Sequence, residues 1–273
     1  MKNYKTLFLC VSIVLVTILL LFGFLVIRRV GTTQENYFFQ RYFSDNSISW
    51  KLQEVPRIDT LEVSQGSYTN KIDSVMLDDS NCLAFGPKDT TKAADFTFFC
   101  YSIMDNQFKR FIINHADLAC GYSNIYEKRL AYDGVFLRFS NYITYTFQHL
   151  PIIVVFDAKG NLLKQIHTKD NVPCPSIIRY KHLYIYERGK TFNSNISSFV
   201  NGQLLYVFSY RVPKISKEFV VDIYSLETGK YLYSAHIGSD KTSINTNMNI
   251  DKIFTDGKNI FIDTRSHLYK LIH

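Results

Sequence analysis

A run of 21 uncharged and mostly apolar residues, from Leu7 to Ile27, separates a short amino-terminal tail from the rest of this 273-residue chain. Basic residues flank the run on both sides, with Arg28 and Arg29 directly after it. At a rise of 1.5 Å per residue, a helix of this length measures about 32 Å, which matches the roughly 30 Å hydrocarbon core of a bilayer. The sequence therefore predicts a tail over residues 1–6 and a transmembrane helix over residues 7–27 that contacts the lipid bilayer along its length.

A cleavable signal peptide is the alternative interpretation of this run. Such a peptide has an apolar stretch of about 7 to 15 residues, followed by small residues at the cleavage site. The present run is longer, and no A-x-A-like pattern precedes Arg28. We therefore expect a retained signal anchor. The positive charges on the two sides of the run are nearly balanced, so the positive-inside rule does not decide the orientation of the helix in the membrane. Because a six-residue tail ordinarily stays in the cytoplasm, we expect a single-pass protein of the cytoplasmic (inner) membrane, with its carboxyl-terminal domain extracytoplasmic (periplasmic).

The remaining chain divides into a juxtamembrane connector, residues 28–46, and a folded domain, residues 47–273. The whole chain is 47% hydrophobic and 15% aromatic, enough to bury a sizeable core. Four of the positive charges behind the formal net charge of +7 flank the predicted anchor. The rest of the chain has 27 basic and 24 acidic residues. Since its basic residues are dispersed, we expect no nucleic-acid partner.

Short runs rich in Val, Ile, Tyr, Phe and Thr, with alternating apolar and polar positions, follow residue 47. This pattern is typical of strands joined by tight turns. The clearest predicted hairpins cover residues 96–113, 151–167 and 219–237. Gly160 and Gly229 can supply the positive φ that such turns require. No segment after the connector has an apolar face at helical spacing over three turns, so we predict an all-β domain.

A recurring unit suggests how these strands are organised. Asp133–Gly134 and Asp256–Gly257 each precede an alternating apolar run, and residues 226–230 (LETGK) close an outer hairpin. Over residues 60–273 this unit resembles the blade repeat of bacterial β-propellers of the quinoprotein, NHL and TolB-like kinds. The resemblance implies about four to six irregular blades of four strands each. The expected structural turns are at Gly134, Gly160, Gly229 and Gly257.

The two ends of the domain are expected to meet. The carboxyl-terminal residues 266–273 form an inner strand that completes a blade with outer strands from residues 47–63, as in ring-closing propellers. A β-sandwich remains the alternative fold. It stays open because Trp50 is the only tryptophan, so no docking tryptophan recurs, and because the spacing of the turns is uneven.

Four cysteines lie outside the predicted anchor: Cys82, Cys100, Cys120 and Cys174. In an oxidising compartment they can form two disulfides in any of three connectivities, and the sequence does not choose between them. The most local option joins Cys82 with Cys100, on neighbouring strands. The alternative is that some of the four are buried thiols.

The domain has no recognisable catalytic set. Its histidines lack metal-ligand spacing, and no nucleophile elbow, phosphate loop or dinucleotide fingerprint occurs. We therefore name no catalytic, cofactor-binding or metal-ligating residue and expect no cofactor. In the aromatic segment 180–192, we expect one strand with Leu183 and Ile185 on one face. Its other face has Tyr180, His182, Tyr184 and Tyr186, either exposed or packed on the next blade.

These features predict a membrane-tethered, non-catalytic binding or scaffold domain for a protein or cell-envelope component. The alternative is an envelope enzyme that acts on a glycan or peptide, with a site formed by loops at the strand ends. The first hypothesis uses exposed aromatic residues as a recognition surface, because tyrosine offers a large contact area with a polar tip.

Overall fold

A computed structural model describes residues 17, 41–42, 51–56, 73–87, 96–105, 107–112, 120–122, 124–212, 216–237, 250–264 and 267–272. The predicted tail and anchor, apart from Thr17, lie outside these residues, as does the connector apart from Arg41 and Tyr42. Within the described residues, no helix has both the length and the apolar character needed to cross a bilayer.

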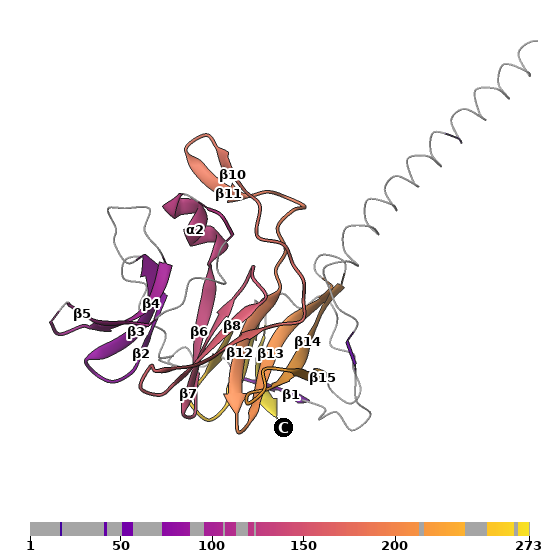
Figure 1. The fold of residues 1–273 in the computed structure, drawn as a ribbon. Helices are drawn as coiled ribbons and strands as arrows, with labels where there is room; N and C mark the ends of the chain where they lie inside the picture. Colours follow the sequence, from indigo (N-terminus) through magenta and orange to yellow (C-terminus); the bar gives the residue numbers. More distant parts are fainter. Residues whose placement is uncertain are drawn as a thin grey trace, which may run out of the picture.

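The described residues form four antiparallel sheets of four strands each, so the all-β expectation is confirmed (Figure 1). The first sheet contains β2 (Asp73–Met76), β3 (Asn81–Pro87), β4 (Phe96–Ser102) and β5 (Gln107–Ile112). The second contains β6 (Gly134–Phe139), β7 (Tyr142–Phe147), β8 (Ile152–Asp157) and β9 (Leu162–His167). The third contains β12 (Asn195–Asn201), β13 (Leu204–Val212), β14 (Ser216–Ser225) and β15 (Tyr231–His236). All three predicted hairpins are present, as β4–β5, β8–β9 and β14–β15.

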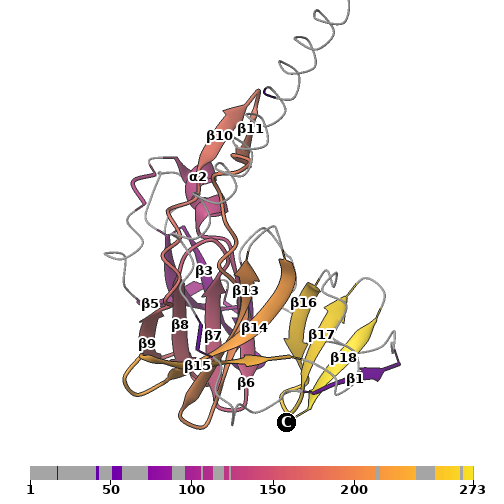
Figure 2. The same cartoon turned by 90° about the vertical axis from the view of Figure 1, so that its right-hand side faces the viewer.

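The fourth sheet joins the two ends of the described domain. It contains β16 (Ile250–Thr255), β17 (Ile260–Thr264), β18 (Leu268–Ile272) and β1 (Lys51–Val55). β1 pairs with β18 from Lys51 opposite Ile272 to Val55 opposite Leu268. The expected pairing of the carboxyl-terminal segment with residues 47–63 is therefore confirmed (Figure 2). The expectation of an inner strand was wrong, because β18 lies between β17 and the outer strand β1.

The sheets contact one another through their first strands and, between the second and third sheets, also through β7. β6 contacts β2, β12 and β16, and β12 also contacts β16. The Arg138 guanidinium of β6 donates to the carbonyl oxygens of Met76 and Leu77 at 2.8 and 3.0 Å. Between the second and third sheets, the hydroxyl oxygens of Thr146 and Ser198 lie 2.6 Å apart in the buried interior. These buried bonds satisfy polar groups that would otherwise oppose close packing of the sheets.

Apolar side chains fill the spaces between consecutive sheets. One cluster joins the first and second sheets around Phe98 and Tyr145, whose ring centroids are 5.2 Å apart. A second lies between the second and third sheets around Val155 and Val207. A third joins the third and fourth sheets and includes Leu137 of β6. The period-two pattern therefore builds a continuous interior, since each sheet packs against its neighbour in the chain.

Three of the four predicted turn glycines have the expected conformation. The φ angles of Gly160, Gly229 and Gly257 are +73°, +72° and +89°. The prediction was wrong for Gly134, which has no positive φ and begins β6 just after the helix α2 (Ile125–Ala131). A Cβ at Gly134 would lie 2.5 Å from the carbonyl oxygen of Thr146. Close approach of the neighbouring strand, rather than a turn, therefore requires glycine here.

The Gly134→Ala variant is expected to have a free energy of unfolding about 1–3 kcal/mol lower than that of the parent chain, because the added methyl group overpacks β6 against β7. Urea unfolding of the detergent-solubilised full chain, followed by circular dichroism, measures this loss. Gly202→Asn is the matched control. Its site is open, since a Cβ added there would have no other atom within 4 Å, and asparagine tolerates the left-handed conformation. Equal effects of the two substitutions would contradict the assigned role of Gly134.

A further repeat appears in the turns at one end of the sheets. Asp78 Oδ1 accepts the backbone N–H groups of Ser80 and Asn81, at 2.8 and 2.9 Å. Asp256 Oδ1 accepts the equivalent N–H groups of Lys258 and Asn259, at 2.9 and 2.7 Å. These turns join the first two strands of the first and fourth sheets. The same Asp-x-x-Asn device at equivalent places indicates that the sheets are repeats of one unit.

Hydrogen bonding also sets the charge of these turns. Burial alone would raise the pKa of Asp256, but hydrogen bonds from Asn259 and Lys258 lower that pKa below its ordinary value. The carboxylate therefore stays ionised in the turn.

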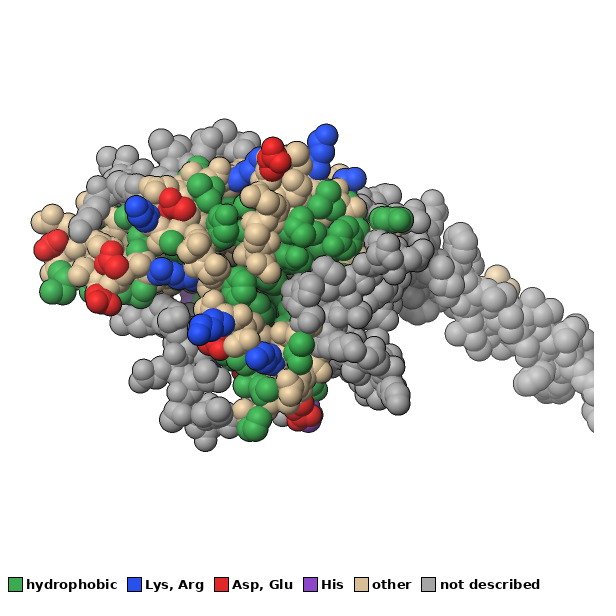
Figure 3. Space-filling model, turned by 90° about the horizontal axis from the view of Figure 1, so that it is seen from below, with side chains coloured by type: hydrophobic (Ala, Val, Ile, Leu, Met, Phe, Trp, Pro, Cys, Tyr) green, Lys and Arg blue, Asp and Glu red, His purple; other side chains and the backbone are tan. Residues whose placement is uncertain are grey.

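Viewed from below, the molecule has Lys, Arg, Asp and Glu side chains interspersed, without a large patch of one sign (Figure 3).

Candidate functional site

Two long connections between consecutive sheets build a projection at one end of the fold. The connection from β5 to β6 contains α2, and the connection from β9 to β12 contains the hairpin β10 (Ile177–Tyr180) and β11 (Leu183–Tyr186). In both ribbon views the hairpin lies beyond α2, at the extreme of the described domain (Figures 1 and 2). We call residues 120–133 and 174–190 together the projection.

Covalent and polar contacts fix the base of the projection. A disulfide joins Cys120 with Cys174, which are 54 residues apart in the sequence. The Tyr122 hydroxyl donates to the carbonyl oxygen of Pro175, the residue after Cys174. Burial raises the pKa of Tyr122 to about 12, with Tyr132 and Glu127 adding to the effect. The tyrosine therefore remains a hydrogen-bond donor at neutral pH.

Contacts between α2 and the β10–β11 hairpin hold the outer part of the projection in place. Asn124 caps α2 by accepting the Tyr126 N–H at 2.8 Å, and its Nδ2 donates to the Tyr184 hydroxyl at 2.6 Å. The Tyr126 and Tyr184 rings stack, with centroids 5.6 Å apart. The Tyr186 hydroxyl donates to the carbonyl oxygen of Leu130 at 2.7 Å. The short helix, marginal by itself, is stabilised by these distant partners.

Strand register gives the hairpin two different faces. Ile178 lies opposite Ile185, and Tyr180 lies opposite Leu183. Side chains opposite each other, and those two positions apart, share a face of a sheet. The outer face therefore consists of Ile178, Tyr180, Leu183 and Ile185, with exposed fractions of 40%, 57%, 57% and 39%. The other face carries Tyr184 and Tyr186, whose contacts are with α2 and its cap.

The sequence pattern misplaced this face. Tyr180, His182, Tyr184 and Tyr186 were expected on one face of a single strand, but the chain turns at Lys181 and His182. Lys181 has a φ of +57°, uncommon for a residue other than glycine. Because of this turn, Tyr180 shares a face with Leu183 rather than with Tyr184.

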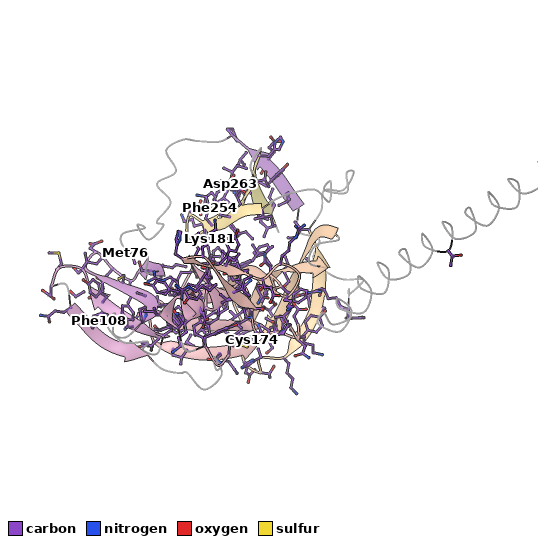
Figure 4. The ribbon with its side chains drawn as sticks, turned by 90° about the horizontal axis from the view of Figure 1, so that it is seen from above. Met76, Phe108, Cys174, Lys181, Phe254 and Asp263 are labelled. Atoms are coloured by element: carbon purple, nitrogen blue, oxygen red, sulfur yellow. A yellow bond between two sulfur atoms is a disulfide. The ribbon has the colours of Figure 1, made fainter. Side chains whose placement is uncertain are left out.

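The projection is also basic. It contains six Lys and Arg residues and three Asp and Glu residues. Glu187 accepts a hydrogen bond from Ser176 at 2.6 Å and pairs with Lys190 at 2.7 Å. Hydrogen bonds from Lys190 and then Ser176 lower the pKa of Glu187. Lys181 Nζ, at the turn, lies 5.6 Å from the centre of the Tyr180 ring (Figure 4 labels Lys181 and Cys174).

A buried histidine lies beneath the hairpin. His149 Nδ1 is 3.1 Å from the carbonyl oxygen of Phe192, and its ring packs on Tyr186 at a centroid distance of 4.4 Å. Burial lowers the pKa of His149, against the opposite influence of Phe192 and Asp133. A neutral imidazole in this place supports Tyr186.

In the described part of the chain, no group of three or more His, Cys, Asp or Glu side chains is arranged to hold a metal ion.

A buried ionic cluster lies where the amino-terminal connector meets the domain. The Arg41 guanidinium contacts Asp222 through Nε at 2.9 Å and Nη2 at 2.9 Å, and Asp170 through Nη2 at 3.3 Å. The side chains of Arg41, Asp222 and Asp170 are only 3%, 1% and 0% exposed, respectively. Burial tends to lower the pKa of Arg41, but Asp222 and Asp170 raise it overall, so the guanidinium stays charged. We call Arg41, Asp170 and Asp222 the Arg41 cluster.

This cluster attaches the connector to two elements. The backbone oxygen of Tyr42 accepts the Ser234 N–H at 2.7 Å, on the outer strand β15. Tyr42 therefore covers part of the edge of β15. The Ser234 hydroxyl also donates to Asp222. Asp170 lies in the connection that continues into the projection, four residues before Cys174. Arg41 was not predicted as a site residue, since nothing in its neighbouring sequence distinguishes it from a surface arginine.

The disulfide in the structure is not the most local of the predicted pairs. Cys120 and Cys174 form the disulfide, while Cys82 and Cys100 are buried thiols. The latter two do lie on neighbouring strands, but Cys82 is opposite Tyr101 and Cys100 is opposite Leu83. An offset of one residue points two side chains to opposite faces of the sheet. Burial raises the pKa of Cys82, which keeps it a thiol.

Comparisons with known proteins assign no family to the chain. No family model matches it, and no curated protein matches it. Among solved structures, glutaminyl cyclase of Myxococcus xanthus aligns with a TM-score of 0.34 and 11% identity, over 74% of this chain and 72% of that one. The computationally designed Ika4 protein aligns with a TM-score of 0.34 and 8% identity, over 86% and 99%. Hydrazine synthase of Kuenenia stuttgartiensis aligns with a TM-score of 0.32 and 13% identity, over 67% and 40%.

Proposed function

We propose that the chain is a membrane-tethered, non-catalytic binding domain of the β-propeller type, held outside the cytoplasmic membrane. Its recognition site is the outer face of the projection, and its partner is a protein or another component of the cell envelope. The single observation that carries this proposal is the exposure of four apolar side chains on one face of a firmly held hairpin.

The propeller part of the proposal is supported by the order of the strands. Each sheet runs in chain order from a first strand that adjoins the other sheets, and the fourth is completed by an amino-terminal strand. A sandwich instead packs two sheets face to face. Four blades, the lower end of the expected range, account for the four sheets.

The tether is supported by the chain length before the Arg41 cluster. Thirteen residues separate Ile27, the end of the predicted anchor, from Arg41. Fully extended, they span at most about 50 Å. A domain fixed at Arg41 therefore stays near the bilayer that holds the anchor. A reporter fused after His273 tests the orientation, and reporter activity in the cytoplasm would contradict it.

The recognition site is supported by the stiffness of the projection. Contiguous exposed apolar groups on soluble proteins mark binding surfaces more often than chance. Here the disulfide and the bonds to α2 hold the hairpin in place, so its outer face is displayed without a large ordering cost on binding.

Site-specific photo-crosslinking in the native membrane tests the proposal. A photoreactive residue replaces Leu183 on the outer face or, as the control, Lys258 in the exposed turn at the opposite end. We expect adducts of a defined envelope component from position 183 and not from position 258. Equal labelling at both positions, or none at 183, would refute the outer face as the recognition site.

A further inference from the structure

We propose that the β10–β11 hairpin docks on the surface of a lipid bilayer, with its outer face in the headgroup layer and its basic side chains against anionic phosphates. This inference rests on the proposed function, because it takes the outer face as the recognition site and names its partner. The observations that carry it are the size of the face, the order of its side chains, the surrounding charge and the place of the connector.

The face is small and lies at the tip of the fold (Figures 1 and 2). It offers four apolar side chains on two short strands that extend beyond the rest of the domain (Figures 1 and 2). A stable protein interface engages about 20–30 residues on each side and needs a surface of matching shape. A bilayer adapts to a narrow tip, so the geometry favours lipid over a rigid protein partner.

The order of side chains along the hairpin fits an interface between water and hydrocarbon. Tyr180 and Leu183 form the pair next to the turn, and Ile178 and Ile185 form the pair behind it. Tyrosine rings favour the headgroup level, where one end is apolar and the other is wet. Lys181, at the turn, has an aliphatic stem that can enter this layer while its ammonium group stays at the phosphates.

Charge around the face is complementary to an anionic surface. Lys181 lies at the turn of the hairpin, Arg179 lies opposite Tyr184 on its other face, and Arg188 follows it. Glu187 pairs with Lys190, so the two add no net charge, and it also accepts a hydrogen bond from the Ser176 hydroxyl. Basic residues beside an apolar face strengthen attachment to anionic lipids. The opposite end of the molecule has mixed charges instead (Figure 3).

The connector attaches to the part of the chain that leads into the projection. Arg41 contacts Asp170, and Asp170 belongs to the connection that leads into the projection. Because a tether raises the effective concentration of the bilayer, a weak contact is sufficient to orient the domain.

The test uses the full chain reconstituted in vesicles of phosphatidylcholine and phosphatidylglycerol, with brominated phosphatidylcholine as a depth-sensitive quencher. The Leu183→Trp variant places a reporter on the outer face, and Lys258→Trp is the matched control at the opposite end. For Leu183→Trp we expect a blue-shifted emission that brominated lipid quenches. For Lys258→Trp we expect emission at the wavelength of exposed tryptophan, without quenching above that of the parent chain.

Two further comparisons separate the parts of the proposal. Replacing Arg179 and Lys181 with Gln, or omitting phosphatidylglycerol, is expected to reduce the quenching of Leu183→Trp. Quenching that is equal with and without the anionic lipid would overturn the headgroup contact. No quenching in either vesicle would overturn bilayer docking altogether. A protein adduct from position 183 in the crosslinking experiment would then still support the proposed function, so the two failures are distinguishable.

Discussion

The Arg41→Met variant is expected to lose about 3–5 kcal/mol of the free energy of unfolding, because it leaves buried carboxylates without their cation. Asp170 and Asp222 are 0% and 1% exposed, and both contact the guanidinium. Methionine keeps much of the aliphatic bulk but donates no hydrogen bond. Urea unfolding of the detergent-solubilised full chain, followed by circular dichroism, measures the loss.

Two controls separate the charge effect from general damage. Arg179→Met removes an exposed arginine and is expected to change the free energy of unfolding by less than about 0.5 kcal/mol. The combined variant Arg41→Met, Asp170→Leu and Asp222→Leu replaces all three charges and is expected to regain much of the loss. If Arg41→Met unfolds like Arg179→Met, the cluster does not stabilise the fold.

The cluster also has a positional consequence. Arg41 and Tyr42 together hold the connector against Asp222 and the edge of β15. Without the guanidinium, the ion pairs that fix the chain next to Tyr42 are lost. The point where the predicted tether meets the fold would then move toward the first paired strand, β1. If the proposed tether holds the domain at a bilayer, its orientation there is expected to depend on the same ion pairs as its stability.

Local patterns predicted the sheets well because their determinants are local. The three predicted hairpins alternate with period two and turn within a few residues, so each can be recognised without knowing the rest of the fold. The helix α2 was missed for the opposite reason. Its seven residues are too few for a helical period, and its stabilising partners, Tyr184 and Tyr186, are more than 50 residues away.

The candidate site depended on contacts that local patterns do not encode. Lys181 and His182 lack the glycine, asparagine or proline that usually marks a turn, so the hairpin looked like one strand. Four cysteines allow three connectivities, and only strand register excludes the pair Cys82 and Cys100. Arg41 became notable only when two distant aspartates surrounded it. The Asp-x-x-Asn turns were not predicted either, because the predicted repeat relied on Asp-Gly pairs and Asp78 is followed by Asp79 rather than glycine.

The double variant Cys120→Ser and Cys174→Ser is expected to lose about 4 kcal/mol of the free energy of unfolding, the chain-entropy value for a closed loop of this size. The loop spans 54 residues and includes the whole second sheet, so the unfolded chain gains freedom over a large part of the domain. Urea unfolding measures the loss, and hydrogen exchange of residues 177–186 shows whether the hairpin also loosens.

Cys82→Ala is the matched control, because it removes a buried sulfur that belongs to no disulfide and is expected to cost only about 1 kcal/mol. Dithiothreitol should destabilise the unmodified chain as much as the double substitution does, and should have no effect on the double variant. If the reductant destabilises both equally, the stabilising bond is not between Cys120 and Cys174. If only hydrogen exchange of the hairpin increases, the bond fixes the outer face locally, and lipid quenching of Leu183→Trp should weaken with it.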